Sequence, residues 1–552
     1  MILDASIYEK SFGSKELFRD IYFSVEDGEK IGMVGRNGIG KSTILKIISG
    51  QDTDFTGDII WRRGASLVTT DQEYADVKPE TTVTEYILSQ IPEYQNLHKI
   101  ITEFPEIDPN DEDYYKKLDE YSNALQRFSD KGFYEIEQKI AQELTNFQLE
   151  NFATRPFVSL SGGQKRLTEV VKIMHSDANL AIIDEPTNFM DYEAKSQFID
   201  WAKSTKTALI IITHDRDVLE TVNKIIEIKD GQSQIYDGNY AQYLSQNASL
   251  TSNSMNQYEI TQNKIKNLKK QIAYAKAKKP AWSGTADKKN PFVVMEERLK
   301  RQLKELEKIE KPSFWVDKSS VENMNYKDAG RYEKYKTKNI RIGLKSGDNK
   351  SKKSLIKVEK LSLGYLETPL FANVNFEIFE GGTLELRGRN GAGKSTIVKA
   401  IISRVDASPV QLFDGTIKVD EHMRVGIYEQ EVGKDLFDKS LHDAIEFVHL
   451  SQKVNITETK IRQLMDSYLF TPDDLGTPVR NLSGGQKARL QIIKMLANDP
   501  NILILDEPTS HLDLPSIEEL ETALGKYSGA ILYISHDGYF RNNLGGEVIQ
   551  VG

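Results

Sequence analysis

The stretch Gly35-Arg36-Asn37-Gly38-Ile39-Gly40-Lys41-Ser42-Thr43 occurs a second time, with one change, at 388–396 (GRNGAGKST). Each copy directly follows a segment that predicts a strand, at 30–34 and 383–387. A glycine-rich turn between a strand and a helix lets backbone N–H groups surround phosphate oxygens at the positive end of the helix dipole. The pattern therefore predicts two phosphate-binding loops and an α/β fold.

Within these loops the lysines are expected to neutralise phosphate charge and the serines to ligate Mg²⁺. The expected cofactors are ATP and Mg²⁺. The loop residues assigned to them are Gly35, Asn37, Gly38, Gly40, Lys41, Ser42 and Thr43, and then Gly388, Asn390, Gly391, Gly393, Lys394, Ser395 and Thr396.

Three further motifs are repeated downstream. They are LSGGQ from Leu160 and Leu482, Asp-Glu-Pro-Thr from Asp184 and Asp506, and Ser/Thr-His-Asp around His214 and His536. In each pair the two copies are 322 residues apart. This constant spacing indicates two copies of one rigid module.

An apolar run typical of a buried parallel strand precedes each acidic motif. Asp184 and Asp506 are expected to hold Mg²⁺ through water. Glu185 and Glu507 are expected to orient the attacking water, because phosphoryl transfer depends mainly on positioning. An acidic pair after a strand can also be a helix cap, but the following Pro-Thr and the fixed distance to LSGGQ argue against a cap.

Two polar residues follow other predicted strands in each copy. Gln72 and Gln430 are expected close to Mg²⁺ or the attacking water. His214 and His536 are expected to hydrogen-bond the γ-phosphate. The catalytic set is therefore the two glutamates and the two histidines.

LSGGQ opens a predicted helix, whose first amides form a second anion site. Each phosphate loop already serves its own nucleotide, so this second site makes sense only if it caps an ATP held by the other copy. The two copies are then expected to close head to tail over two ATP molecules, as an intramolecular dimer within a monomer. The residues assigned to this role are Ser161, Gly162, Gly163 and Gln164, and Ser483, Gly484, Gly485 and Gln486.

An aromatic residue precedes each phosphate loop. Phe12 and Tyr365 are candidates for stacking on adenine, and ordinary core packing is the alternative.

The composition excludes several classes of protein. The 552 residues include no cysteine, which rules out disulfides and cysteine-bound metals. No apolar run approaches the ~18 residues of a membrane span. The N-terminus does not resemble a signal peptide. A cytoplasmic location without a membrane partner is expected.

The charge is segregated along the chain. The whole chain has a net charge of −10, but residues 251–354 contain 26 Lys and Arg against 12 Asp and Glu. Apolar stripes predict two packed helices in this segment, at about 255–277 and 294–310. The loop between them (278–292) contains Trp282 and several lysines. A basic helical hairpin between acidic halves suggests a polyanionic partner.

These features predict three parts. They are a first domain at 1–243 with a helical insertion at about 95–150, a basic linker at 244–354 with its tip at about 278–292, and a second domain at 355–552. The insertion is either an enlarged packing subdomain or a projecting contact arm.

The ordered set of motifs resembles the ATP-binding-cassette superfamily in both halves. With a helical linker between tandem cassettes and no membrane segment, the chain resembles the ABC-F family of ribosome-associated ATPases. The resemblance implies binding in the ribosomal E site through rRNA, with the linker reaching the P-site tRNA and the peptidyl-transferase centre. It also implies retained D-loop aspartates at Asp191 and Asp513. Phe189 replaces the family's usual histidine, which raises the question of whether both sites hydrolyse equally.

Two other functions share the cassette motifs: the ATPase subunit of a transporter and a DNA-maintenance ATPase. A transporter subunit needs no basic helical insert, and DNA-maintenance cassettes typically carry zinc cysteines or longer coiled coils. Within the ribosomal interpretation, a general translation factor and an antibiotic target-protection protein remain open alternatives.

Overall fold

The computed structural model describes all residues of the chain except 13–14, 72–73, 75–76, 107–112, 279, 281–289, 308, 310, 312–314, 324–325, 333, 337, 345–352, 366–367, 404–410 and 430–431. It contains two compact units, one of Met1–Tyr240 with Ile340–Gly552 and one of Ala241–Asn339. Residues 1–240 are called the first cassette, 340–552 the second cassette and 241–339 the linker unit. The boundaries at 244 and 354 stay predictions.

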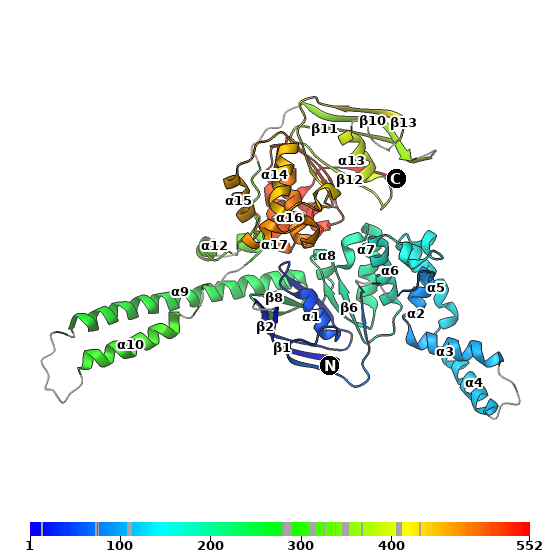
Figure 1. The fold of residues 1–552 in the computed structure, drawn as a ribbon, viewed down its shortest axis with the longest axis horizontal. Helices are drawn as coiled ribbons and strands as arrows, with labels where there is room; N and C mark the ends of the chain where they lie inside the picture. The colour runs from blue at the N-terminus through cyan, green and yellow to red at the C-terminus, as the bar shows by residue number, and fades with distance from the viewer. Residues whose placement is uncertain are drawn as a thin grey trace. The chain divides into compact units, whose positions relative to one another are not determined.

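Each cassette contains a mostly parallel sheet (Figure 1). In the first cassette the strand order is β5 (Leu67–Thr69), β6 (Leu180–Asp184), β7 (Ala208–Ile212), β3 (Lys30–Gly35), β8 (Lys224–Lys229) and an antiparallel β9 (Gln232–Asp237). In the second it is β14 (Val425–Tyr428), β15 (Ile502–Asp506), β16 (Ala530–Ile534), β12 (Thr383–Arg387) and β17 (Glu547–Gln550). The predicted α/β fold with two repeated domains is confirmed.

A second, antiparallel sheet accompanies each parallel sheet. The first has the order β2 (Lys15–Val25), β1 (Leu3–Phe12), β4 (Thr56–Trp61), and the other has β11 (Thr368–Phe379), β10 (Ser354–Tyr365), β13 (Gln411–Val419). Together with the helix after the phosphate loop, it forms one core on one face of the parallel sheet.

The remaining helices cover the other face of each parallel sheet. Alternate residues of the buried strands point to the two cores: Ile182 packs with the antiparallel sheet and Ile183 with the helices. Burial on both faces explains why these strands are continuous apolar runs. The helices of the first cassette are α1 (Lys41–Ile48), α2 (Val83–Ser89), α3 (Pro92–Glu103), α4 (Tyr114–Asp130), α5 (Ile136–Asn146), α6 (Gly162–Met174), α7 (Tyr192–Ser204) and α8 (Arg216–Leu219). Those of the second are α13 (Lys394–Ser403), α14 (Leu441–Ser451), α15 (Glu458–Ser467), α16 (Gly484–Leu496), α17 (Leu514–Gly525) and α18 (Gly538–Leu544).

The helical insertion of the first cassette comprises α3, α4 and α5. Helices α3 and α4 pack through aromatic rings, with the centroids of Tyr94 and Phe128 5.5 Å apart. Helix α4 ends at Asp130, and Gly132 then adopts a φ of 68° that reverses the chain. Helix α5 buries Ile140 and Leu144 in the core of the first cassette.

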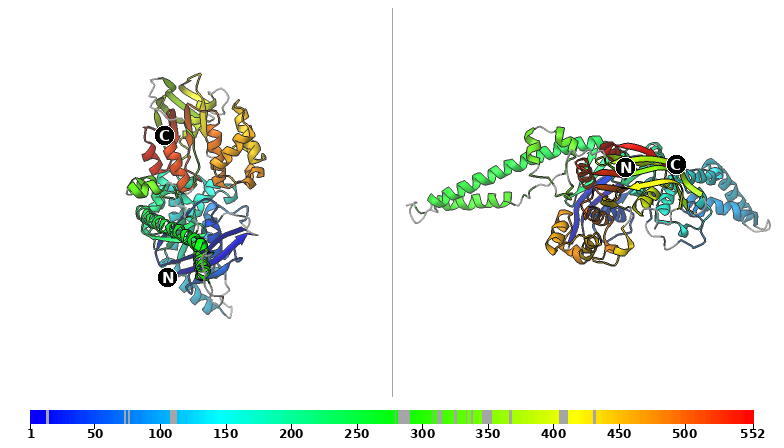
Figure 2. Two further views of the ribbon diagram at one scale, coloured as in Figure 1. Left: turned by 90° about the vertical axis from the view of Figure 1, so that its left-hand side faces the viewer. Right: turned by 90° about the horizontal axis from the view of Figure 1, so that it is seen from above.

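The linker unit contains α9 (Tyr240–Lys278), α10 (Pro291–Glu307), α11 (Lys318–Asn323) and α12 (Tyr326–Tyr332). Helices α9 and α10 lie side by side in all views (Figures 1 and 2). Helix α9 has 39 residues and begins 15 residues before the predicted start at about 255. The early start was missed because the buried tyrosines of its first turn, Tyr240 and Tyr243, are followed by buried polar residues, Asn247 and Thr251, which interrupt the apolar stripe.

None of the described helices is both long and apolar enough to cross a membrane.

Candidate functional site

The two phosphate loops connect β3 to α1 and β12 to α13. In the first loop, the Lys41 ammonium donates to the carbonyls of Gly35 and Arg36 at 2.6 and 3.2 Å. In the second, Lys394 donates to those of Gly388 and Arg389 at 2.7 and 2.8 Å. Both lysines are almost completely buried. The two loops therefore hold their cations in the same way.

Glycine is required where each loop enters its helix. Gly40 and Gly393 have φ values of 102° and 97°, in the left-handed region that side chains rarely adopt. A methyl group on Gly393 would lie 2.7 Å from the ring of Phe371. The loops therefore need glycine both for the backbone conformation and for packing on the antiparallel sheet.

The predicted Mg²⁺ ligands meet in each cassette. The Ser42 hydroxyl donates to the Asp184 carboxylate at 3.2 Å, and that of Ser395 donates to Asp506 at 2.8 Å. A hydroxyl and a carboxylate at the end of a strand are hard oxygen ligands of the kind that Mg²⁺ prefers. The residues present therefore fit the ion.

Each catalytic candidate glutamate lies beside the candidate histidine of its own cassette. The Glu185 carboxylate is 3.7 Å from Nε2 of His214, and that of Glu507 is 3.4 Å from Nε2 of His536. Burial, together with the neighbouring aspartate, raises the pKa of each glutamate to about 8. Burial and the nearby lysine lower the pKa of each histidine to about 3, so both imidazoles are neutral at pH 7.

This pair of raised pKa values predicts a pH-dependent stability of the protein without nucleotide. Because the folded state binds more protons than the unfolded state between about pH 4.5 and 8, the two glutamates destabilise the fold as the pH rises through this range. The double variant Glu185→Gln/Glu507→Gln should therefore melt above the wild type, and the difference should grow from pH 7 to 9 by about 1 kcal/mol per carboxylate.

Differential scanning calorimetry of both proteins at several pH values measures this effect. The histidines do not interfere, because their unfolded pKa of about 6.5 confines their contribution to lower pH. Parallel curves for the two proteins from pH 7 to 9 would contradict the assignment of buried, protonated glutamates.

The D-loop aspartate of each cassette contacts the phosphate loop of the other. The Asp191 carboxylate accepts a hydrogen bond from the backbone N of Asn390 at 3.2 Å. The Asp513 carboxylate accepts one from the backbone N of Asn37 at 3.3 Å. The loop around Lys394 is thereby paired with the first cassette, and the loop around Lys41 with the second.

The LSGGQ motifs begin α6 and α16. Ser161 and Ser483 are the N-caps, and each hydroxyl accepts from the amide three residues later, in Gln164 or Gln486, at 3.3 Å. A methyl group on Gly485 would lie 2.4 Å from the Asn37 side chain, so this signature lies directly against the opposite phosphate loop.

A cavity of about 660 Å³ lies between the other signature and the second phosphate loop. Its lining includes Gly163, Gln164, Lys394 and Ser395, together with Tyr365 at the end of β10. The Tyr365 ring is 39% exposed, which leaves it accessible for stacking. Gln72, Gln430 and the side chain of Phe12 lie outside the described residues.

One group of functional contacts was not predicted from the sequence. The Lys172 ammonium on α6 pairs with Asp71, the residue before Gln72, at 2.9 Å, and Lys494 on α16 pairs with Glu429, before Gln430, at 2.5 Å. An ion pair thereby connects each signature helix to the residue that precedes Gln72 or Gln430. The sequence did contain a signal for these contacts, because Lys172 and Lys494 are 322 residues apart, the same spacing as the repeated motifs.

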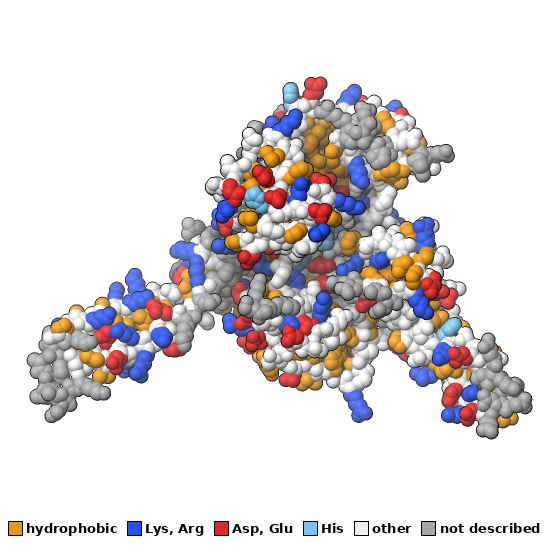
Figure 3. Space-filling view, viewed as in Figure 1, with side chains coloured by type: hydrophobic (Ala, Val, Ile, Leu, Met, Phe, Trp, Pro, Cys, Tyr) orange, Lys and Arg blue, Asp and Glu red, His pale blue; other side chains and the backbone are white. Residues whose placement is uncertain are grey.

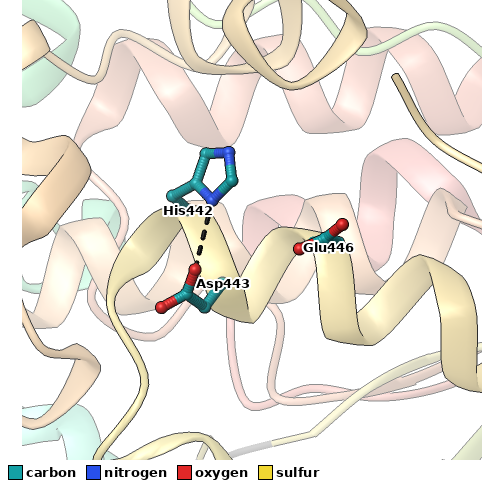
Figure 4. Close-up of side chains that lie close together, drawn as sticks. All are labelled: His442, Asp443 and Glu446. Carbon is teal, nitrogen blue, oxygen red and sulfur yellow. Dashed lines mark hydrogen bonds and ion pairs between the residues drawn. The ribbon is translucent and has the colours of Figure 1, made fainter. Parts of the chain in front are cut away.

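A further cluster of possible metal ligands lies on α14. His442, Asp443 and Glu446 have ligand atoms within 4.8 Å of one another (Figure 4). The imidazole of His442 contacts Glu458 at 2.7 Å and Asp443 at 3.2 Å, and these hydrogen bonds raise its pKa. Both ring nitrogens of His442 therefore already face carboxylate oxygens, and the three side chains are exposed or only partly buried. We therefore interpret the cluster as a surface ion-pair group.

Comparison with known proteins agrees with this geometry. A family model described as ABC transporter matches residues 18–188 and 371–510, and a second model of the same description matches 226–327. The chain is 32% identical over 562 residues to the putative ATP-binding protein YdiF of Bacillus subtilis, covering 100% of the chain and 80% of that protein. It is 30% identical over 554 residues to ABC transporter F family member 2 of Arabidopsis thaliana, covering 98% of the chain and 75% of that protein.

A solved structure of similar fold is that of the archaeal ribosome recycling factor aABCE1 in complex with the archaeal ribosomal stalk protein aP1. The TM-score is 0.57 at 17% identity, and the match covers 99% of this chain and 87% of that one. At this identity the likeness concerns the fold.

Proposed function

The chain belongs to the ABC transporter F family and is an ATPase, and from this premise we propose that its ATP cycle acts on the ribosome. The observation that carries the proposal is the joining of a basic helical hairpin to two ATP-binding cassettes. The structural likeness to a protein named as a ribosome recycling factor also supports a role at the ribosome.

In the proposed cycle, two ATP molecules lie between the cassettes. Lys41 and Lys394 neutralise phosphate charge, and the signatures that begin at Ser483 and Ser161 supply amides to the same phosphates from the opposite cassette. Mg²⁺ held by Ser42 with Asp184, and by Ser395 with Asp506, would supply charge neutralisation between the phosphates.

Glu185 and Glu507 are the proposed residues that orient the attacking water. Both are protonated in the protein without nucleotide at pH 7, since their pKa is about 8. Binding of a cation beside the carboxylates lowers their pKa and restores the charged form. The neutral His214 and His536 then donate to the γ-phosphate, and this arrangement would couple hydrolytic competence to the presence of substrate.

The hairpin is the proposed ribosome-contacting part. Its helices pack through Ile265, Ile272 and Leu299, which are buried, and Lys269 pairs with Glu307 across the hairpin at 2.7 Å. Lysine and arginine side chains, with acidic ones among them, lie along the visible surface of the hairpin (Figure 3). The exposed members on α9 are Lys264, Lys266, Lys269, Lys270, Lys276 and Lys278. A solvent-facing basic surface of this kind suits phosphate groups of rRNA or tRNA.

Sedimentation through sucrose gradients tests the proposed partner. The Glu185→Gln/Glu507→Gln variant with ATP should migrate with ribosomes, and the wild type should do so less because hydrolysis releases it. A variant that stays at the top of the gradient with ATP present, while binding ATP normally, would contradict the proposal. Migration with membranes would favour a transporter subunit.

The basic surface gives a salt-dependence prediction. Changing Lys264, Lys266, Lys270 and Lys276 to Gln should reduce the slope of log affinity against log salt by about 3, because each lost phosphate contact removes 0.7 to 0.9. Lys269 is excluded because its partner is Glu307.

Filter binding of labelled ribosomes between 50 and 300 mM KCl measures the slope. The matched control changes four exposed lysines of the second cassette to Gln, namely Lys434, Lys453, Lys460 and Lys526. Equal slopes for the hairpin variant and the wild type would mean that the basic surface only solubilises the hairpin.

The finer proposal is that the hairpin acts near the P-site tRNA and the peptidyl-transferase centre, with the cassettes in the E-site region. This action either modulates translation in general or protects the ribosome from antibiotics. Growth with and without the gene in lincosamide, streptogramin, pleuromutilin and macrolide drugs separates the two: only a target-protection protein changes drug tolerance.

A further inference from the structure

The Asp191 carboxylate connects three parts of the compact unit that holds both cassettes. One oxygen accepts from the Ala194 backbone N at 3.0 Å and so caps α7. The other oxygen accepts from the Asn390 backbone N at 3.2 Å and from the Gln148 side-chain amide at 2.6 Å. Asp191 is only 1% exposed. Gln148 therefore fixes the same oxygen that contacts the phosphate loop around Lys394.

Gln148 occupies a defined position at the end of the helical insertion. It is the second residue after α5, its φ is 59°, and its N–H bonds the Thr145 carbonyl at 3.0 Å. The next N–H, that of Leu149, bonds the Leu144 carbonyl at 2.6 Å. This pair of bonds around a left-handed residue is the Schellman type of helix end. The side chain of Gln148 is consequently held in place by the end of α5.

The second cassette contains the same helix end with a different side chain. Leu469 is the second residue after α15 and has a φ of 56°. The Phe470 N–H bonds the Met465 carbonyl at 2.9 Å, as that of Leu149 bonds Leu144. A leucine has no donor for a carboxylate. The D-loop aspartate of the second cassette, Asp513, accepts from the backbone N–H groups of Ser516 and Asn37, as Asp191 accepts from those of Ala194 and Asn390, and the side chain at position 469 adds no donor.

We propose that Gln148 is a positioning residue for the ATP site around Lys394, and that it makes this site sensitive to the helical insertion. The insertion reaches the D-loop of that site through a side-chain hydrogen bond for which the site around Lys41 has no donor at the matched position. This inference rests on the proposed composite ATP sites and goes beyond them, because it assigns different control to the two sites.

The physical effect follows from what Asp191 does. Its carboxylate must keep one oxygen on the Asn390 amide while the two cassettes close on ATP. A charge-assisted hydrogen bond from Gln148 holds that oxygen and removes alternative rotamers of Asp191. Without this bond, the oxygen that faces the second cassette keeps only the Asn390 backbone N–H and the more distant Arg389 guanidinium, at 3.6 Å, and its position is less restricted. The phosphate loop around Lys394 then adopts more than one position relative to Asp191, and hydrolysis of the ATP bound there slows.

The test measures each site separately. In the Glu185→Gln background, chemistry is expected only at the site of Lys394 and Glu507, and in the Glu507→Gln background only at the site of Lys41 and Glu185. The full-length protein, in excess over the ATP, is mixed with radiolabelled ATP. Rapid quench then gives the rate of the first turnover, which does not depend on how fast the two cassettes reopen.

Gln148→Leu, which copies Leu469, should lower the first-turnover rate about five- to tenfold in the Glu185→Gln background, since the lost bond involves a charged acceptor. In the Glu507→Gln background the change should be less than about twofold. Gln148→Glu, which keeps the size but loses the donor, should slow the same site at pH 8. Lowering the pH to 6 should restore part of the rate, because a protonated carboxyl beside Asp191 donates again.

The possible results distinguish an error in the role of Gln148 from an error in the proposed catalytic glutamates. Equal effects of Gln148→Leu in both backgrounds, or a lower melting temperature with unchanged rates, would mean that Gln148 only stabilises the end of α5, and would overturn the inference. Absence of the pH rescue in Gln148→Glu, measured against the background protein at the same pH, would overturn it as well. If neither glutamine background lowers turnover, the proposed catalytic glutamates are wrong and the failure lies with the proposed function.

Discussion

Turnover of ATP by the Glu185→Gln/Glu507→Gln variant is expected to fall at least about a hundredfold, equivalent to about 2.7 kcal/mol in the barrier, while ATP binding survives. Glutamine has the size of glutamate but cannot take the charge that orients the attacking water. Both carboxyls are already neutral at pH 7 without nucleotide, because burial raises their pKa to about 8. The substitution therefore removes catalysis with little disturbance of the fold.

Steady-state phosphate release and binding of a fluorescent ATP analogue measure the two properties. The matched control replaces two exposed glutamates, Glu150 and Glu547, by glutamine and should keep full turnover. Undiminished hydrolysis in the Glu185→Gln/Glu507→Gln protein would refute the assignment of these residues. Loss of ATP binding in that protein would mean that the carboxylates serve mainly to hold the nucleotide.

Replacing residues 280–289 by a Gly/Ser loop of the same length should abolish the proposed effect of the protein on translation or drug tolerance. Helix α9 ends at Lys278 and α10 begins at Pro291, and the exchange keeps Asn290, whose side chain accepts from the Phe292 backbone N at 3.0 Å at the start of α10. The replaced segment, whose residues 281–289 lie outside the described part of the chain, contains Trp282, Lys288 and Lys289. An aromatic ring among cations suits unpaired bases and phosphates.

Growth in the relevant drug and translation in a cell extract measure this loss, with protein level and ATPase rate checked in parallel. A third protein that restores only Trp282, Lys288 and Lys289 within the Gly/Ser loop should recover much of the effect. Full activity of the Gly/Ser protein at normal expression would mean that the tip is merely a connector between two helices.

The hairpin and the cassettes differ in how well their boundaries were predicted, for a physical reason. Strands buried on both faces are mostly apolar, so the continuous apolar runs before Asp184 and Asp506 predicted β6 and β15 to within one residue. In the first turns of helix α9 the apolar stripe is interrupted by buried polar residues such as Asn247, whose side-chain amide donates to the Trp315 carbonyl at 2.9 Å. Such a contact joins residues far apart in the sequence, so no local sequence pattern predicts it.

The sequence by itself determined the repeated module, the α/β fold, the residues of the two phosphate loops and the order of the acidic and signature motifs. These follow from local requirements: a phosphate loop needs glycine at left-handed positions such as Gly40, and a helix start needs a cap such as Ser161. Only the tertiary structure decided the buried state of Glu185 and Glu507 and the link from Gln148 to Asp191, which has no counterpart at Leu469. Each of these depends on which distant groups meet in a low-dielectric interior, where burial shifts a pKa and a single hydrogen bond orients a charge.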